Sequence, residues 1–305
     1  MYFERLKRFL ARPDVKQNPA KALLKRLWWR LRWTLTDKPY VIQFTKNLKI
    51  GVPKTGSASL IYYQGYSELE TADFIHHFLR PGMVVVDVGA HIGEYTLLAA
   101  EKVGTTGEVH AFEPQSHLFP ILSNNVQMNQ LSNVTLNCAA VSNAIGEIEF
   151  EVFDEPSVSS IRKQTQLSQD AKLVKVACTS LDTYWSNQQR QIDLIKVDVE
   201  GAEKMVFQGA EKILNQPSTK ASTWLFEYSP KGYASFGYRP SDLLELLKRH
   251  DYKVWQYCGN GKITDFDPAA SSITGIINLI AAKDKTYLLS LLQGENISIS
   301  EYAQT

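Results

Sequence analysis

The residues from Val84 to Thr96 read VVVDVGAHIGEYT, an apolar run that ends at Asp87 and then turns through Gly89 and Gly93. Glycines let the backbone approach a ligand closely, and the carboxyl end of a strand in an α/β sheet opens into the crevice where ligands bind. Glu113 ends the next apolar run, and its carboxylate can accept hydrogen bonds from both hydroxyls of a ribose. The spacing therefore predicts a nucleoside-containing ligand, and the GxxxG pattern weakens the case for a dinucleotide, which favours GxGxxG.

A second group of ionisable residues lies in LIKVDVEGAE, residues 194 to 203. Lys196, Asp198 and Glu200 would share one face of a strand if the extended geometry persisted. Such groups are costly to bury unless they are paired or used. Glu227 ends the next apolar run, STWLFEY, and is expected to lie near Asp198 across the crevice. The structural alternative is a buried Lys196–Asp198 ion pair, with Glu200 at the cap of a following helix.

The elements that position these residues alternate between short apolar runs and helical stretches. We expect strands at 84–88, 108–113, 133–138, 192–199 and 222–228, and helices at 93–102, 116–129, 202–214 and 240–250. This order predicts an α/β fold, a Rossmann-like doubly wound and mostly parallel sheet. An antiparallel β-ribbon at about 146–180, with a loop at its tip, is expected as an insertion. The segments YKVWQY and GIINLIAA, joined by a loop with Asn260-Gly261, are expected to form a terminal edge hairpin.

The chain is expected to have three parts: a basic N-terminal helical extension and linker at 1–66, a ligand-binding domain at 67–292 and a tail at 293–305. Residues 1–38 hold eleven Lys or Arg and three Asp or Glu, a net charge of +8 in a chain whose total is +1. Asn18 and Pro19 predict the start of a helix over 19–35. Its apolar stripe consists of Leu24, Leu27, Trp28, Leu31 and Leu35. Trp29 and Trp33 are expected on the arginine-rich side, exposed.

Two uses of this helix stay open. A stripe flanked by basic residues suits peripheral contact with a membrane surface through residues 1–38. The other use is packing on the body of the protein or on a second subunit of a homo-oligomer.

The spacing of the cysteines, the length of the apolar runs and the charge of the chain indicate which compartment and which partners to expect. Cys138, Cys178 and Cys258 are widely spaced and predict neither a disulfide framework nor a zinc site. The longest uncharged apolar run, Ile273 to Ala282, is about half of the ~20 residues that a membrane-spanning helix needs. We expect a cytoplasmic protein, with a peripheral position on the inner membrane face as the alternative. The body outside residues 1–38 is acidic, so we expect no nucleic-acid partner.

Taken together, VVVDVGAHIGEYT, AFEP, NCAAVSN, TSLDTY and LIKVDVEGAE resemble the FkbM-type methyltransferases over roughly Gly82 to Ala282. The resemblance implies a class I fold and S-adenosyl-L-methionine (SAM) as the cofactor. It also implies methylation of a hydroxyl on a sugar, glycan or glycolipid. A further set of positions carries over by motif: Asp87, Gly89, Ala90 and Gly93 along the methionine part of SAM, Glu113 at the ribose, and Ala140 and Val141 beside the adenine. His91 stands where the family often has Asn.

Methyl transfer to a hydroxyl requires alignment of the acceptor and removal of its proton. The candidates for this chemistry are Asp198, Glu200, Glu227 and Lys196. Asp198 and Glu227 could instead hold Mg²⁺, a cation that prefers oxygen ligands. The acceptor is expected to be a small molecule, a glycan or a lipid-linked sugar. Two other functions stay open at this point: an NAD-dependent oxidoreductase and a non-catalytic binding protein with the same fold.

Overall fold

The computed structural model describes residues 10, 12–54, 57–153, 160–161, 172–268 and 275–293. The chain separates into two compact units, and the boundary between them falls after Leu69. Within the described residues, no helix has both the length and the apolar character needed to cross a membrane.

The first unit contains a long helix, a β-hairpin and two short helices. Its elements are α2 (Pro13–Gln17), α3 (Pro19–Leu35), β1 (Tyr40–Gln43), β2 (Lys49–Val52) and α4 (Ala58–Gln64). Strands β1 and β2 pair antiparallel, with Tyr40 opposite Val52. Helix α3 begins where the sequence predicts, because Asn18 caps it: the Lys21 N–H donates to the Asn18 side chain at 2.9 Å.

The orientation predicted for α3 is wrong. Trp29 and Trp33 are buried, each 7% exposed, whereas the leucines of the apolar stripe are exposed. Trp29 stacks on Tyr62 with 5.3 Å between ring centroids, and its ring meets Tyr63 edge to face. Tyr62 and Tyr63 belong to α4, a helix that the sequence analysis did not predict. Aromatic partners on α4 therefore decide which side of α3 is buried.

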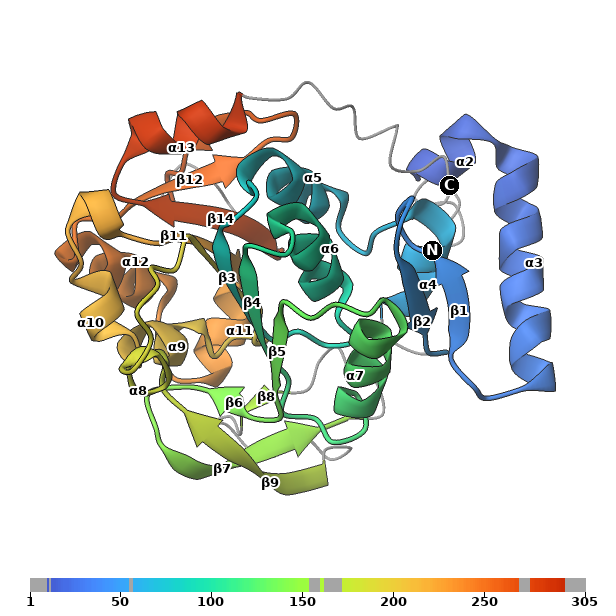
Figure 1. The fold of residues 1–305 in the computed structure, drawn as a ribbon, viewed down its shortest axis with the longest axis horizontal. Coiled ribbons are helices and arrows are strands. Elements are labelled where there is room, and N and C mark those ends of the chain that lie inside the picture. Colours follow the sequence, from blue (N-terminus) through green and yellow to red (C-terminus); the bar gives the residue numbers. More distant parts are fainter. Residues whose placement is uncertain are drawn as a thin grey trace. The chain divides into compact units, whose positions relative to one another are not determined.

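The second unit is built on an eight-stranded sheet with the order β13-β12-β14-β11-β10-β3-β4-β5 (Figure 1). The strands are β3 (Val84–Val88), β4 (Glu108–Phe112), β5 (Val134–Asn137), β10 (Leu194–Val197), β11 (Thr223–Tyr228), β12 (Lys253–Tyr257), β13 (Ile263–Asp265) and β14 (Ile277–Ala282). The five strands β3, β4, β5, β10 and β11 are parallel, and β14 joins β11 antiparallel. The predicted Rossmann-like, mostly parallel sheet is confirmed.

The two segments of the predicted terminal hairpin pair antiparallel, as β12 and β14, but their place in the sheet differs from the prediction. The Asn260-Gly261 turn connects β12 to β13, and β14 lies between β11 and β12, inside the sheet. Strand β14 reads INLIAA and is buried over Leu279 to Ala282, which suits an inner position more than an edge.

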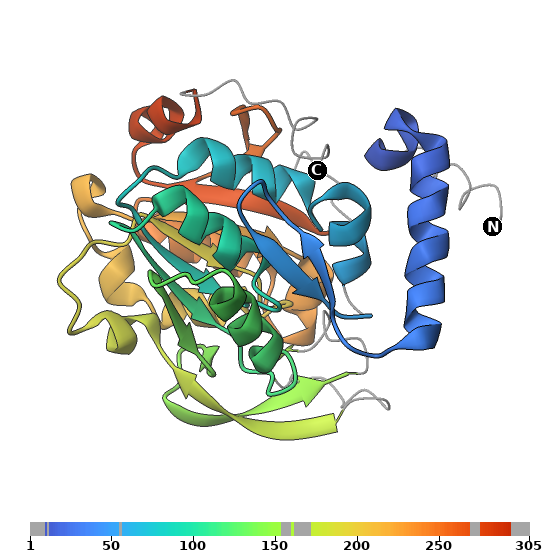
Figure 2. The same ribbon diagram turned by 45° about the vertical axis from the view of Figure 1, so that its right-hand side comes forward.

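Helices cover both faces of the sheet (Figures 1 and 2). They are α5 (Leu69–Phe78), α6 (Glu94–Val103), α7 (Phe119–Met128), α8 (Leu181–Trp185), α9 (Glu203–Gln208), α10 (Glu211–Leu214), α11 (Pro230–Ser235), α12 (Pro240–Arg249) and α13 (Lys285–Leu292), with a 3₁₀ turn at Ser218–Lys220. Val86 of β3 shares one core cluster with Phe207 of α9 and Leu243 of α12. Helices α5, α6 and α7 lie over the opposite face (Figure 1).

The predicted helix at 202–214 is two helices, α9 and α10, which meet at Gly209. A Cβ at Gly209 would lie 2.1 Å from the Ser142 carbonyl oxygen, so a close approach between distant segments fixes this position. The interruption between α9 and α10 therefore coincides with a contact to a segment far away in the sequence.

The predicted inserted ribbon is present as a separate four-stranded sheet with the order β6-β9-β7-β8. Its strands are β6 (Ala140–Val141), β7 (Gly146–Val152), β8 (Ser160–Ile161) and β9 (Lys172–Thr179). Strands β7 and β9 pair antiparallel, with Phe150 opposite Val174. Apart from β8, the loop expected at the tip lies outside the described residues.

Candidate active site

The candidate site lies where the direction of the strand order reverses. From β3 the chain builds outward through β4 and β5 on one side, and β10 and β11 lie on the other side. Doubly wound sheets bind ligands at the carboxyl ends of the strands at such a reversal. Asp87 near the end of β3, Glu113 after β4 and Asp198 after β10 all lie at this edge.

The turn after β3 is held close to the neighbouring strand. Gly89 and Gly93 have φ of +82° and +92°, and His91 adopts a positive φ of +52°. The N–H groups of Gly89 and Ala90 both donate to the Phe112 carbonyl, at 3.0 and 2.9 Å. A Cβ at Gly89 would lie 1.8 Å from the Asp198 carbonyl oxygen, so this position requires glycine. Left-handed backbone at a non-glycine such as His91 is typical of functional sites.

Glu113 is buried and faces this turn. Its carboxylate accepts the N–H of His91 and the N–H of Gln115, both at 2.9 Å. Burial raises the pKa of Glu113 to about 7, although these two backbone donors act in the opposite direction. A carboxylate has about four acceptor positions, more than its two backbone donors use, so the group can also accept a hydrogen bond from a ribose hydroxyl. Burial lowers the pKa of the His91 imidazole to about 4, so it is neutral near pH 7.

The residues predicted beside the adenine lie in the inserted sheet. Ala140 and Val141 form the buried strand β6 and pair with Cys178 and Thr179 of β9. Cys138, which follows β5, lies near Glu113: burial raises the pKa of its thiol, and the Glu113 carboxylate raises it further. The sequence analysis considered this cysteine only for disulfide and metal chemistry.

One buried cation joins the two predicted clusters. The Lys196 ammonium lies 3.1 Å from Asp198 Oδ2 and 3.7 Å from Asp87 Oδ1. It also lies 5.1 Å from the centroid of the Tyr95 ring. The other oxygen of Asp87, Oδ2, accepts the Thr96 hydroxyl at 2.6 Å. The structure thus contains the ion pair of the structural alternative and extends it to Asp87.

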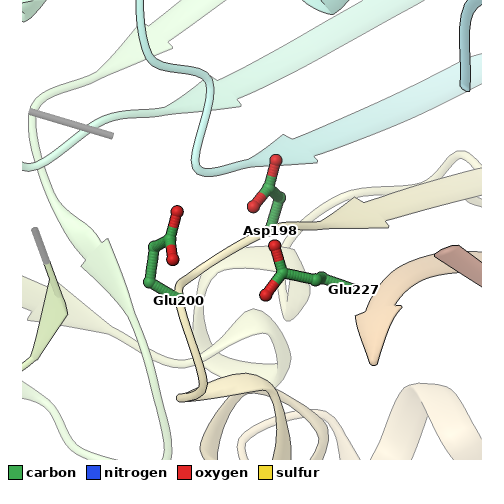
Figure 3. Close-up of side chains that lie close together, drawn as sticks. All are labelled: Asp198, Glu200 and Glu227. Carbon is green, nitrogen blue, oxygen red and sulfur yellow. The ribbon is translucent and has the colours of Figure 1, made fainter. Parts of the chain in front are cut away.

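Three carboxylates lie close together after β10 and near the end of β11 (Figure 3). One oxygen each of Asp198, Glu200 and Glu227 lies within 4.8 Å of the others. The extended geometry does not persist to Glu200: β10 ends at Val197, and Glu200 has a φ of +56°. The turn still brings the Glu200 carboxylate to the other two.

Glu203 holds this turn, a role that the sequence analysis did not assign. Its carboxylate accepts the N–H groups of Val199 and Gly201, at 3.1 and 3.2 Å. A Cβ at Gly201 would lie 2.8 Å from the Gly232 carbonyl carbon, so the turn also packs tightly against α11. The helix cap was predicted at Glu200, but the N-cap of α9 is Ala202, and Glu203 stabilises the turn from the first position of the helix. Glu203 is an acidic residue in the first turn of a helix, where carboxylates favour backbone N–H groups, and this was the available signal.

The fold and the site together define a class I SAM-dependent methyltransferase. The family described as Methyltransferase FkbM domain matches residues 87–254, more than half of the chain. The chain belongs to this family. Its membership decides against the NAD-dependent alternative.

The relatives are distant. The chain is 26% identical over 208 residues to the 31-O-demethyl-FK506 methyltransferase FkbM of Streptomyces tacrolimicus, with 58% of this chain and 78% of the relative covered. It is 27% identical over 157 residues to the methyltransferase sdnD of Sordaria araneosa, covering 42% and 60%. The crystal structure of a methyltransferase FkbM from Methylobacillus flagellatus KT aligns with a TM-score of 0.41 and 15% identity, covering 74% of this chain and 54% of that one.

Proposed function

We propose that this protein methylates a hydroxyl group on a sugar, glycan or glycolipid, with SAM as the methyl donor. The observation that carries the proposal is the group formed by Asp198, Glu200 and Glu227 beside the glycine turn. Carboxylates accept hydrogen bonds from hydroxyls and can take up their protons. A neutral acceptor with several hydroxyls suits such an acidic edge better than an anionic acceptor does.

The residues around the turn fit SAM. The absence of a Cβ at Gly89 lets the turn after β3 close on the Asp198 backbone, and at this turn Asp87, Gly89, Ala90 and Gly93 would border the methionine part. Glu113 offers lone pairs to the ribose, and Ala140 and Val141 would border the adenine. SAM supplies a methyl group bonded to a positively charged sulfur, which leaves as a neutral thioether.

The carboxylates can act as the base that removes the proton of the acceptor hydroxyl. A hydroxyl is a weak nucleophile, and it becomes a strong one as its proton moves to a base. Asp198 is the preferred base because its side chain is one-third exposed, and an acceptor can therefore reach it. The proton ends on the carboxylate, the hydroxyl oxygen forms the bond to the methyl carbon, and the carbon–sulfur bond breaks. Lys196 fixes the position of Asp198, and Glu200 and Glu227 orient the acceptor.

The name of one relative supports a hydroxyl acceptor. The Streptomyces tacrolimicus protein is named as a methyltransferase of 31-O-demethyl-FK506, so its name places the methyl group on oxygen. For this chain we propose only that the methyl group is transferred to an oxygen, and not that the acceptor has the FK506 skeleton.

The same three carboxylates are the candidate ligands for Mg²⁺, since their oxygens are close enough to share one ion. The Lys196 ammonium lies 3.1 Å from Asp198 and already supplies positive charge to one of these carboxylates. We therefore propose a base that acts without a metal ion.

The test is a transfer assay with SAM that carries a labelled methyl group. Purified protein is incubated with monosaccharides, oligosaccharides and glycolipid extracts, and formation of S-adenosylhomocysteine and of methylated product is followed by mass spectrometry. A methyl ether on a sugar hydroxyl is the expected product. Transfer only to nitrogen, carbon or a non-sugar hydroxyl would overturn the proposed acceptor. SAM binding without turnover on any acceptor would favour a non-catalytic protein.

A further inference from the structure

Helix α3 presents a continuous apolar surface to solvent. Its leucine stripe, defined as Leu24, Leu27, Trp28, Leu31 and Leu35, has side chains that are between 46% and 72% exposed. Single exposed leucines are ordinary in folded proteins, but an apolar strip along about three turns of a helix marks an interaction surface.

The stripe is not the side that holds α3 in its own unit. Ala22, Trp29 and Trp33 are the buried residues of the helix. At 100° per residue, these three lie opposite the stripe, so α3 uses its tryptophan side for packing. The four leucines of the stripe are exposed, and Trp28 contacts its own unit through the indole N–H, which donates to the Tyr40 hydroxyl at 3.2 Å.

Basic residues border the stripe. Helix α3 contains five Lys or Arg and no Asp or Glu. Helical geometry places Lys21 and Arg32 along one border of the stripe and Arg30 along the other. Lys21 and Arg30 are exposed, and the Arg32 guanidinium donates to the Lys38 carbonyl at 2.8 Å. Together with the +8 charge of residues 1–38, this pattern complements a negatively charged partner.

A second copy of the helix is a poor partner. A symmetric pair of α3 helices joined through the stripe would bring the basic borders of both copies together, with no acidic residue on either helix to offset them. The partner of α3 must be apolar where it meets the leucine stripe and negatively charged where it meets the basic borders. An anionic lipid bilayer has both properties, because its interior accepts leucine side chains and its phosphates bind Lys and Arg.

We propose that α3 lies flat on an anionic membrane surface, with the leucine stripe inserted at the level of the headgroups. Trp28, at the edge of the stripe, suits that boundary because indole is both apolar and a hydrogen-bond donor. The proposal requires no spanning helix, and it holds whichever acceptor the enzyme methylates. It places the catalytic unit beside any lipid-linked sugar in the same membrane.

The test is flotation of the full chain with vesicles, either pure phosphatidylcholine or phosphatidylcholine mixed with phosphatidylglycerol, at low and high salt. The wild-type chain is expected to bind the anionic vesicles and to bind less at high salt. The double variant Leu27→Asp and Leu31→Asp should bind about tenfold less or weaker still. The matched control is Val41→Asp, because Val41 is also apolar and 50% exposed but lies in β1, and this variant should bind like the wild type.

Charge is tested separately by Lys21→Gln with Arg30→Gln, which should lower partitioning by roughly fivefold for each residue. All three variants change exposed side chains, and their thermal unfolding should match the wild type. Failure of the wild-type chain to bind anionic vesicles, or equal binding by the Leu27→Asp, Leu31→Asp variant, would overturn the proposal. A dimer in ultracentrifugation that this double variant dissociates, without vesicle binding, would assign the stripe to a second copy instead.

Discussion

Glu113 gives the sharpest test of the cofactor site, because its environment links SAM binding to pH. Its carboxylate is buried, and the pKa is raised from 4.5 to about 7, chiefly by burial. The ionised form is the better acceptor for ribose hydroxyls. If SAM binds that form, the free protein must lose a proton from Glu113 wherever the pH is below about 7.

The direction and the size of the pH dependence of SAM affinity follow from this linkage. At about pH 6 only about a tenth of Glu113 is ionised, and at about pH 8 about nine tenths is, so SAM affinity should rise about tenfold over that range. The stability of the free protein should change in the opposite sense. Between pH 4.5 and about 7 the folded state holds a proton that the unfolded state releases, so this group makes folding less favourable as pH rises.

The assay is calorimetric titration of SAM across this range, in buffers with different heats of ionisation. Glu113→Gln should weaken binding at about pH 8 by roughly 1 to 3 kcal/mol and remove the part of the pH dependence that belongs to this group. An amide retains one acceptor oxygen where the carboxylate has two, so one of the N–H groups of His91 and Gln115 loses its partner.

Glu203→Gln is the control. Burial raises the pKa of Glu203 to about 7 as well, but its carboxylate bonds to the turn of Val199 and Gly201 and is not expected to touch SAM. This variant should keep the pH dependence of binding. Affinity that does not vary with pH in the wild-type protein, or that varies equally in Glu113→Gln, would refute the ribose assignment.

The remaining predictions concern the chemistry and the turn. Asp198→Asn should lower turnover by about a hundredfold or more and leave SAM affinity unchanged, as steady-state rates and calorimetry would show; a wild-type rate would exclude Asp198 as the base. Gly89→Ala should lower the free energy of unfolding by roughly 3 kcal/mol or more, because the φ of Gly89 is +82° and the new Cβ would lie 1.8 Å from the Asp198 carbonyl oxygen. A soluble Gly89→Ala protein with full SAM affinity would contradict that geometry. EDTA should leave the methylation rate unchanged, whereas a loss restored by Mg²⁺ would make the three carboxylates a metal site.

The strands of the sheet were predictable because they are buried on both faces. VVVDV reads as an apolar run, and β3 occupies Val84–Val88 as predicted. The sequence also predicted that the candidate site residues lie close together, because the carboxyl ends of parallel strands meet at one edge of the sheet. The roles of Asp198, Glu200 and Glu227 stay predictions, although the structure shows that their side chains converge.

The features that sequence could not supply depend on contacts between distant segments. The tryptophan side of α3 is buried because Tyr62 of α4 stacks on Trp29, and the periodicity of α3 alone gives no sign of that partner. The break at Gly209 exists because the Ser142 carbonyl lies against it. A hydrophobic pattern within one helix shows that two sides differ, and the neighbouring element decides which of the two is covered.

Lys196 links Asp87 to Asp198, and this link bears on how the effects of substitutions at these two residues are interpreted. The sheet register places Lys196 of β10 directly opposite Asp87 of β3. Its ammonium lies between the Asp87 and Asp198 carboxylates, while the Gly89 turn rests on the Asp198 backbone. A change on either carboxylate therefore alters the partner of the same buried cation. Because the backbone contact between Gly89 and Asp198 does not involve that side chain, Asp198→Asn removes the charge while the geometry of the turn is preserved, which is why it separates chemistry from cofactor binding.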